Sequence, residues 1–134
     1  MKKAISGLMI LITILGCLCL CGCTKYTSSF KALQFVHSNT SKSASMTYKN
    51  FEGNYSFKMK TGKDADATLV YSGRTEGCDV TVYYDYADEK ELLFVVKAGE
   101  SVSGSVPLPK DSTIYVIVET EDKATSGDFS FKIE

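Results

Sequence analysis

The side chains best suited to chemistry in this 134-residue chain are its five cysteines. Four of them, Cys17, Cys19, Cys21 and Cys23, fall within a short apolar segment, and the fifth is Cys78. Thiolates bind zinc when they are grouped, alone or with His, in a folded loop. The four clustered thiols have no His or acidic neighbour in their apolar segment, so we expect neither a metal site nor a cofactor there.

The order of residues at the N-terminus is that of a secretory signal. Lys2 and Lys3 form a basic start, an apolar run covers residues 4–20, and no acidic residue occurs before Glu52. A basic start, an apolar centre and small residues before a cleavage site define such signals. The run of 17 residues is also close to the lower limit for a membrane-spanning helix, so an uncleaved anchor helix is the alternative.

The end of the apolar run favours cleavage and acylation. Leu20-Cys21-Gly22-Cys23 resembles the lipobox of bacterial lipoproteins, although Cys21 departs from the usual Ala, Ser or Thr. The resemblance implies a diacylglycerol thioether on Cys23, cleavage just before it, and a protein held in the cell membrane on its extracytoplasmic side. Cys17 is the alternative lipid attachment site, because residues 14–17 fit the pattern loosely. The first partner that we expect is therefore membrane lipid, through acylated Cys23.

Processing would leave one small, acidic domain. The 112 residues after residue 22 carry 13 basic and 16 acidic side chains, and residues 52–134 alone have a formal charge of −7. A chain of this length suffices for one hydrophobic core. Because nucleic-acid binding depends on neutralising phosphates with basic side chains, this composition argues against a nucleic-acid partner.

No group of polar residues forms a recognisable catalytic motif. His37 is the sole histidine and has no nucleophile placed by a motif, and Cys78 shares the parity of Val80 and Val82, as a buried structural cysteine would. The acidic residues fall in predicted turns. Because no Ca²⁺-loop motif is present, we interpret these turns as solvated, and whether they bind Ca²⁺ is left open. These acidic groups are Asp64 and Asp66; Asp85, Asp88 and Glu89; and Glu119, Glu121, Asp122 and Asp128.

Two regions follow Cys23. Residues 23–45 are rich in Ser and Thr, which predicts a flexible tether, although an apolar patch at residues 30–36 could be a strand or a short helix. From residue 46 onward apolar residues alternate with polar ones, the pattern of half-buried strands separated by Gly and Asp turns. The expected strands are 55–60, 67–71, 78–84, 92–96, 101–106, 114–119 and 129–133. We therefore predict an all-β domain over residues 46–134, an antiparallel, jelly-roll-like sandwich of about eight strands.

The final strands carry a second resemblance. Ile114-Tyr115-Val116-Ile117-Val118-Glu119, followed by Ser126-Gly127-Asp128-Phe129-Ser130-Phe131, resembles the end of bacterial pre-peptidase C-terminal domains. From about residue 47 the order of elements is also similar to small lipoproteins of Gram-positive bacteria. The resemblance implies a β-sandwich without established catalytic residues.

The tyrosines suggest where a ligand could bind. The chain has eight Tyr and no Trp, and aromatic faces stack on sugars and on protein partners. Tyr71, Tyr83 and Tyr115 are the candidate ligand-facing residues, with packing on the sheets as the alternative. The favoured function is a non-catalytic accessory or binding protein whose second partner is an extracytoplasmic protein or a polysaccharide. A carbohydrate- or cell-wall-binding module that uses these tyrosines is the alternative.

Overall fold

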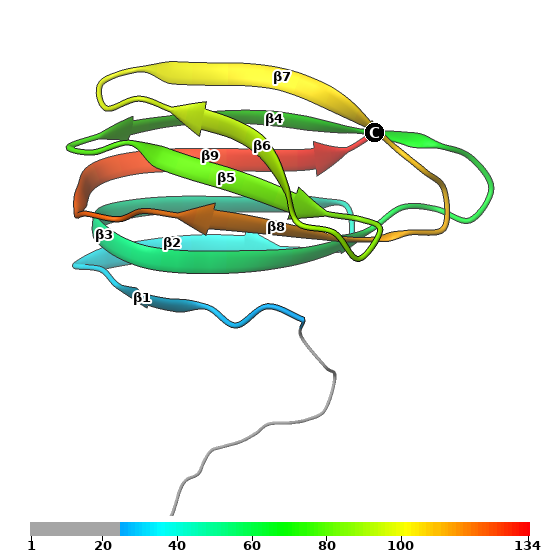
Figure 1. The fold of residues 1–134 in the computed structure, drawn as a ribbon, viewed down its shortest axis with the longest axis horizontal. Coiled ribbons are helices and arrows are strands. Elements are labelled where there is room, and N and C mark those ends of the chain that lie inside the picture. The colour runs from blue at the N-terminus through cyan, green and yellow to red at the C-terminus, as the bar shows by residue number, and fades with distance from the viewer. Residues whose placement is uncertain (1–24) are drawn as a thin grey trace, which may run out of the picture.

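The computed structural model describes residues 25–134, and within this range the chain forms nine strands and no helix (Figure 1). No helix able to cross a membrane occurs in that part of the chain. The strands are β1 (Ser29–Lys31), β2 (Gln34–Asn39), β3 (Ser43–Lys60), β4 (Ala67–Glu76), β5 (Val80–Asp85), β6 (Glu91–Val96), β7 (Ser101–Leu108), β8 (Thr113–Glu119) and β9 (Ala124–Ile133).

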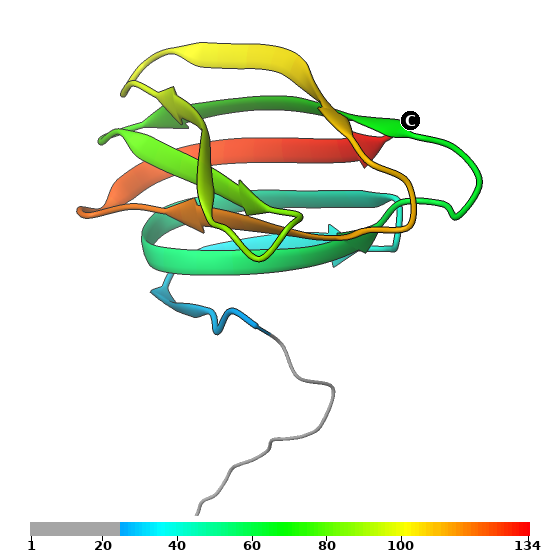
Figure 2. The same ribbon diagram turned by 45° about the vertical axis from the view of Figure 1, so that its right-hand side comes forward.

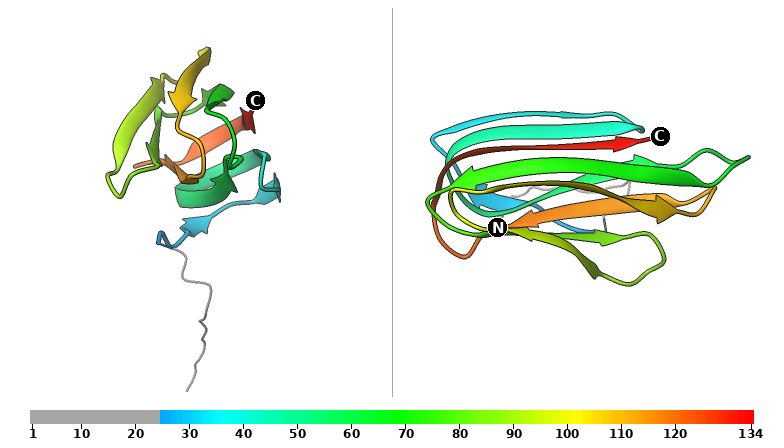
Figure 3. Two further views of the ribbon diagram at one scale, coloured as in Figure 1. Left: turned by 90° about the vertical axis from the view of Figure 1, so that its right-hand side faces the viewer. Right: turned by 90° about the horizontal axis from the view of Figure 1, so that it is seen from above.

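The strands form an antiparallel β-sandwich, which confirms the predicted fold class. The first half of β3 pairs with β9 and β2, whereas its second half pairs with β8 and β1. This divides the strands into sheet A, in the order β6-β5-β8-β3-β1, and sheet B, in the order β7-β4-β9-β3-β2. The end-on view in Figure 3 shows the two layers.

The long strand β3 passes from one sheet to the other through a sharp bend, visible in Figure 2. Asn50 and Gly53 adopt positive φ angles of 55° and 126° at this bend. A Cβ atom at Gly53 would lie 2.3 Å from the Ser29 carbonyl oxygen, so only glycine fits where β1 crosses the bend.

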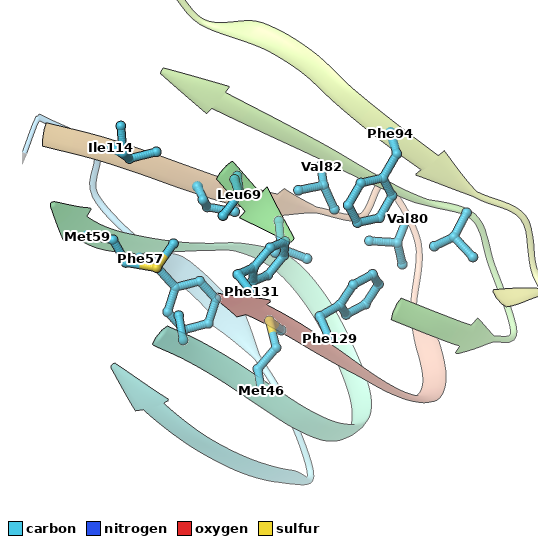
Figure 4. Packing of buried hydrophobic residues seen from close by; sticks show 14 of the residues in the cluster. Met46, Phe57, Met59, Leu69, Val80, Val82, Phe94, Ile114, Phe129 and Phe131 are labelled. Atoms are coloured by element: carbon cyan, nitrogen blue, oxygen red, sulfur yellow. The ribbon is translucent and has the colours of Figure 1, made fainter. Parts of the chain in front are cut away.

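Alternating side chains from both sheets meet in one core (Figure 4). Phe57 of sheet A packs against Phe131 of sheet B, with ring centroids 5.9 Å apart, and Phe94 lies 6.1 Å from Phe129. The expected inward faces of β5 and β8 are correct, since Val80, Val82, Ile114, Val116 and Val118 are all inaccessible to solvent. Cys78 is only half-buried, and its thiol donates to the Asp122 carbonyl oxygen at 3.4 Å. Burial raises the pKa of this thiol above its ordinary value.

The flexible tether predicted for residues 23–45 is wrong from Lys25, the first described residue, onward. Residues 30–36 contribute to two short strands, and β3 already begins at Ser43. Phe35 packs on Phe30 at 4.5 Å and on Phe51 at 5.9 Å, so these strands are held by aromatic contacts with the core. The Ser-rich composition reflects strands with one face in water, because alternate positions of such a strand can be polar.

Two ends of the sandwich can be distinguished by their loops. At the arm end, the β3–β4 loop pairs with the β7–β8 loop, since the Thr61 amide donates to the Ser112 carbonyl at 2.9 Å. At the opposite end, the turns after β4, β6 and β8 meet (Figure 1). We use "arm end" for the first because the described chain starts there.

Candidate functional site

The first four described residues, 25–28, form an N-terminal arm that is fixed to sheet A. Its main attachment is Asp85, the last residue of β5, which is 1% exposed. Lys25 Nζ lies 2.8 Å from Asp85 Oδ2, and the Tyr26 hydroxyl donates to the same oxygen at 2.8 Å. The backbone amide of Glu89 donates to Asp85 Oδ1 at 3.1 Å. The carboxylate therefore joins the arm, β5 and the β5–β6 loop.

The electrostatics of this clamp favour an ionised carboxylate. Burial alone would raise the pKa of Asp85, but the hydrogen bonds from Lys25 and Tyr26 together outweigh it and hold this pKa below its ordinary value. The hydrogen bonds to Asp85 and Asp88 raise the pKa of Lys25. Removal from water, followed by the hydrogen bond to Asp85, raises the pKa of Tyr26. All three groups keep their ordinary charges at neutral pH.

The arm covers part of the outer face of sheet A. The Tyr26 ring meets the edge of Tyr115 with centroids 5.5 Å apart, and the Ser56 amide donates to Ser28 Oγ at 2.9 Å. Ile117 points to this outer face and is nevertheless only 2% exposed. Part of this outer face is therefore closed to solvent, and the arm contacts it at Tyr115 and Ser56.

The three predicted ligand-facing tyrosines do not share one exposed row. Tyr71 points between the sheets, where its ring stacks on Phe94 with centroids 4.7 Å apart. Tyr83 and Tyr115 do lie together on the outer face of sheet A, as their parity predicts. Lys90 Nζ lies 4.4 Å from the centre of the Tyr83 ring and also pairs with Glu119 at 2.7 Å. One face of Tyr83 is thus occupied by a cation within the protein.

Beside Tyr83 the outer face of sheet A is hollowed. The hollow has a volume of about 360 Å³ and lies toward the β8–β9 turn. Tyr83 and Val95 provide its apolar lining, and its acidic lining comes from Asp79, Glu119, Glu121 and Asp122. Asp79 accepts a hydrogen bond from the Ala98 amide and forms an ion pair with Lys97. These two contacts hold the pKa of Asp79 below its ordinary value. An aromatic ring beside several carboxylates can stack on a sugar and accept hydrogen bonds from its hydroxyls.

Sheet B presents a different outer face. The register places one serine from each of its five strands in a single row across the sheet, namely Ser38, Ser45, Ser130, Ser72 and Ser103. Neighbouring strands are about 4.8 Å apart, so the row is a regular series of hydroxyls. Shallow hollows of about 300 and 470 Å³ lie on either side of Ser72 and Ser103. Sequence inspection missed this row, because only the register brings these residues together.

Other chemistry-bearing residues do not converge. The Nδ1 atom of His37 lies 3.2 Å from the Tyr55 hydroxyl at the edge of the sandwich. Among residues 25–134, no group of three or more His, Cys, Asp or Glu side chains is arranged to hold a metal ion. Asp85 was predicted to lie in a solvated turn; it is instead buried in the clamp. The lipobox residue Cys23 and the alternative Cys17 lie outside the described residues.

Comparisons with known proteins give matches among solved structures alone. No family model matches the chain, and no curated protein matches it. Among solved structures, a family 29 carbohydrate-binding module in complex with mannohexaose is 14% identical, with a TM-score of 0.43, covering 79% of this chain and 78% of its own. A structure of disulfide-linked pili, the Bacillus endospore appendages, is 18% identical, with a TM-score of 0.44, covering 90% and 96%. Both TM-scores lie below 0.5, so neither likeness assigns a family or a function to this chain.

Proposed function

We propose that this protein is a non-catalytic lipoprotein, anchored in the cell membrane through Cys23 and facing the extracytoplasmic side. The observation that carries the proposal is Leu20-Cys21-Gly22-Cys23 at the end of a basic and then apolar segment. Lys25, two residues after the proposed attachment site, is bound to Asp85 of the sandwich. A cysteine that marks the start of the mature chain is compatible with this fold, because the nine strands described in residues 25–134 and their core lie after it.

The anchor can be tested in a bacterial host by substituting either cysteine. The full chain should incorporate labelled palmitate, partition into the detergent phase and lose the mass of residues 1–22. Cys23→Ala should abolish the palmitate label and the loss of mass, whereas the matched variant Cys17→Ala should leave both unchanged. Detergent partitioning does not distinguish the variants, because an uncleaved chain keeps its apolar segment. The reverse pattern would assign the lipid to Cys17, and a full-length, unlabelled wild-type protein in the membrane would instead support the uncleaved anchor helix.

A second candidate is that the sandwich binds an extracytoplasmic polysaccharide in the hollow beside Tyr83. The combination of an aromatic ring with Glu119 and Asp122 in one hollow favours this over the other surfaces. A sugar ring would have to displace the Lys90 ammonium from Tyr83 or stack on the other side of the ring. Loss of one aromatic contact costs about 1.4 kcal/mol, or about tenfold in affinity.

Binding to purified cell-wall polysaccharide measures this directly. Tyr83→Ala should weaken binding about tenfold. Tyr71→Phe keeps the interior ring and should bind like the unmodified protein. Equal affinities for all three proteins would place any polysaccharide site elsewhere, and no measurable binding would reject this second candidate.

A further inference from the structure

We propose that the N-terminal arm holds the sandwich in one orientation on a lipid surface, with the β5–β6 and β7–β8 loops beside the lipid and the β8–β9 turn directed away from it. This inference rests on the proposed anchor at Cys23. It concerns what the arm does once that anchor exists. A flexible tether would instead leave the sandwich free to rotate above the membrane.

The available length of chain is the first argument. Two residues of extended chain span at most about 7 Å. Lys25 is two residues after Cys23, and its ammonium is already bound to Asp85 and Asp88. The length of chain thus limits how far a lipid on Cys23 could lie from Lys25 while these contacts persist.

The second argument is that the attachment of the arm is distributed over buried groups. Tyr26 contacts Asp85 and Tyr115, and Ser28 accepts the Ser56 amide, so three of the four arm residues have partners on sheet A. Releasing the arm would separate Tyr26 from Tyr115 and leave the Asp85 carboxylate without two of its donors. A buried carboxylate that loses its partners is costly, which favours the attached arm.

The loops around the arm are in contact with one another. A hollow of about 340 Å³ is lined by Lys25, Lys58, the β5–β6 loop and the β7–β8 loop. The Asp111 amide donates to the Gly62 carbonyl at 2.7 Å, which brings the β3–β4 loop to the same end. A lipid surface next to Lys25 would face this set of loops together.

The two ends of the sandwich differ in charge, and the difference favours this orientation. Exposed lysines at the arm end come from several loops and strand ends, namely Lys42, Lys58, Lys60, Lys63 and Lys110. Acidic side chains lie there as well and nearly balance the lysines: Asp85 and Asp88 are paired with Lys25, and the three loops of this end also carry Asp64, Asp66, Glu89 and Asp111. The opposite end carries an excess of acidic side chains, among them Glu76, Asp79, Glu100, Glu121 and Asp122. Anionic lipid attracts lysines and repels carboxylates, so it favours the arm end.

The orientation can be measured with a lipid attached chemically. Residues 23–134, which contain both complete sheets, are prepared with Cys78→Ser and coupled through Cys23 to a maleimide lipid in vesicles of phosphatidylcholine and phosphatidylglycerol. A fluorescent amino acid is placed at position 87 in the β5–β6 loop or at position 123 in the β8–β9 turn. Spin-labelled lipid headgroups should quench position 87 at least threefold more than position 123.

Two matched variants separate the arm from general effects of charge. Tyr26→Ala combined with Asp85→Asn should bring the two quenching values close together, while circular dichroism confirms that the sandwich is intact. Asp111→Asn removes one carboxylate at the same end but none of the arm contacts, and it should preserve the threefold difference. If the variant with both Tyr26→Ala and Asp85→Asn unfolds, Tyr26→Ala alone should reduce the difference in quenching between positions 87 and 123.

Equal quenching at the two positions of the unmodified domain, or stronger quenching at position 123, would overturn the orientation. Persistence of the full difference after loss of the arm contacts would overturn the role of the arm. Because the lipid is coupled in vitro, these outcomes do not depend on acylation in cells. Failure of the proposed anchor would appear only in the palmitate experiment.

Discussion

Substitution of Phe35 tests whether the segment before residue 46 is a folded part of the sandwich. Phe35 is half-buried in β2, and its ring lies 4.5 Å from Phe30, 4.9 Å from Tyr55 and 5.9 Å from Phe51 between centroids. Truncation of a fully buried Phe to Ala costs about 3–5 kcal/mol. For this half-buried ring with three aromatic neighbours we expect Phe35→Ala to cost about 2–3 kcal/mol.

The assay is the unfolding of residues 23–134 by urea and by heat, monitored by circular dichroism. A loss of that size should lower the melting temperature by about 8–12 °C in a domain of this length. The neighbouring residue Val36 provides the control, because it lies on the same strand but is 70% exposed. Val36→Ala should change stability by less than about 0.5 kcal/mol. If Phe35→Ala cost no more stability than Val36→Ala, β2 would not be packed on the core, and the prediction of a flexible tether would be correct for this segment.

Two further predictions concern buried groups. Because the folded pKa of Asp85 is lower than its unfolded value of about 3.9, its contribution to stability is complete above about pH 5 and is lost as the pH falls through the folded pKa. Urea midpoints measured from pH 7 to pH 3 should therefore fall less for Asp85→Asn than for the unmodified domain, and parallel curves would contradict the clamp. A Cβ atom at Gly73 would lie 2.2 Å from Phe129 Cδ1, so Gly73→Ala should cost about 2–3 kcal/mol in thermal unfolding. Gly62→Ala, where a Cβ atom meets nothing within 4 Å, should cost less than about 0.5 kcal/mol, and equal losses would refute the packing argument.

Local alternation was enough to predict which faces of the central strands are buried. Ile114 and Val116 of β8 are inaccessible to solvent, and Tyr115 between them points outward, as a period of two requires. Both neighbours of β8 in sheet A, β5 and the second half of β3, pair with it in unbroken register. Where a strand is central and its partners are regular, the sequence pattern and the fold lead to the same assignment.

Composition misled the prediction where strands lie at the edge of the sandwich. In β2, Phe35 faces inward and Ser38 faces outward, so half of the strand can be polar without loss of packing. Ser and Thr are also common in flexible linkers, and composition alone does not separate the two cases. The deciding interaction is with β3, whose pairing with β2 places Phe35 opposite Tyr48.

The candidate site was less predictable because its partners are distant in sequence. Tyr26 and Asp85 are separated by 59 positions, and no local pattern links them. Likewise, the inward orientation of Tyr71 depends on Phe94 and on Gly104, where a Cβ atom would lie 2.6 Å from the Tyr71 hydroxyl. The sequence could nominate polar and aromatic residues, but only the pairing of strands decides which of them meet.

The direction of β3 explains why the arm is at this end of the sandwich. The second half of β3 runs from Asn54 to Lys60 toward the β3–β4 loop, and β1 is antiparallel to it, with Ser29 opposite Asn54. Backward from Ser29, the chain must therefore run toward Lys58 and the end of β5, where Lys25 meets Asp85. Had the first half of β3 taken up β1 in the same antiparallel sense, the chain would enter from the opposite, more acidic end. The choice of which half of β3 pairs with β1 thus decides which loops a lipid on Cys23 would bring to the membrane.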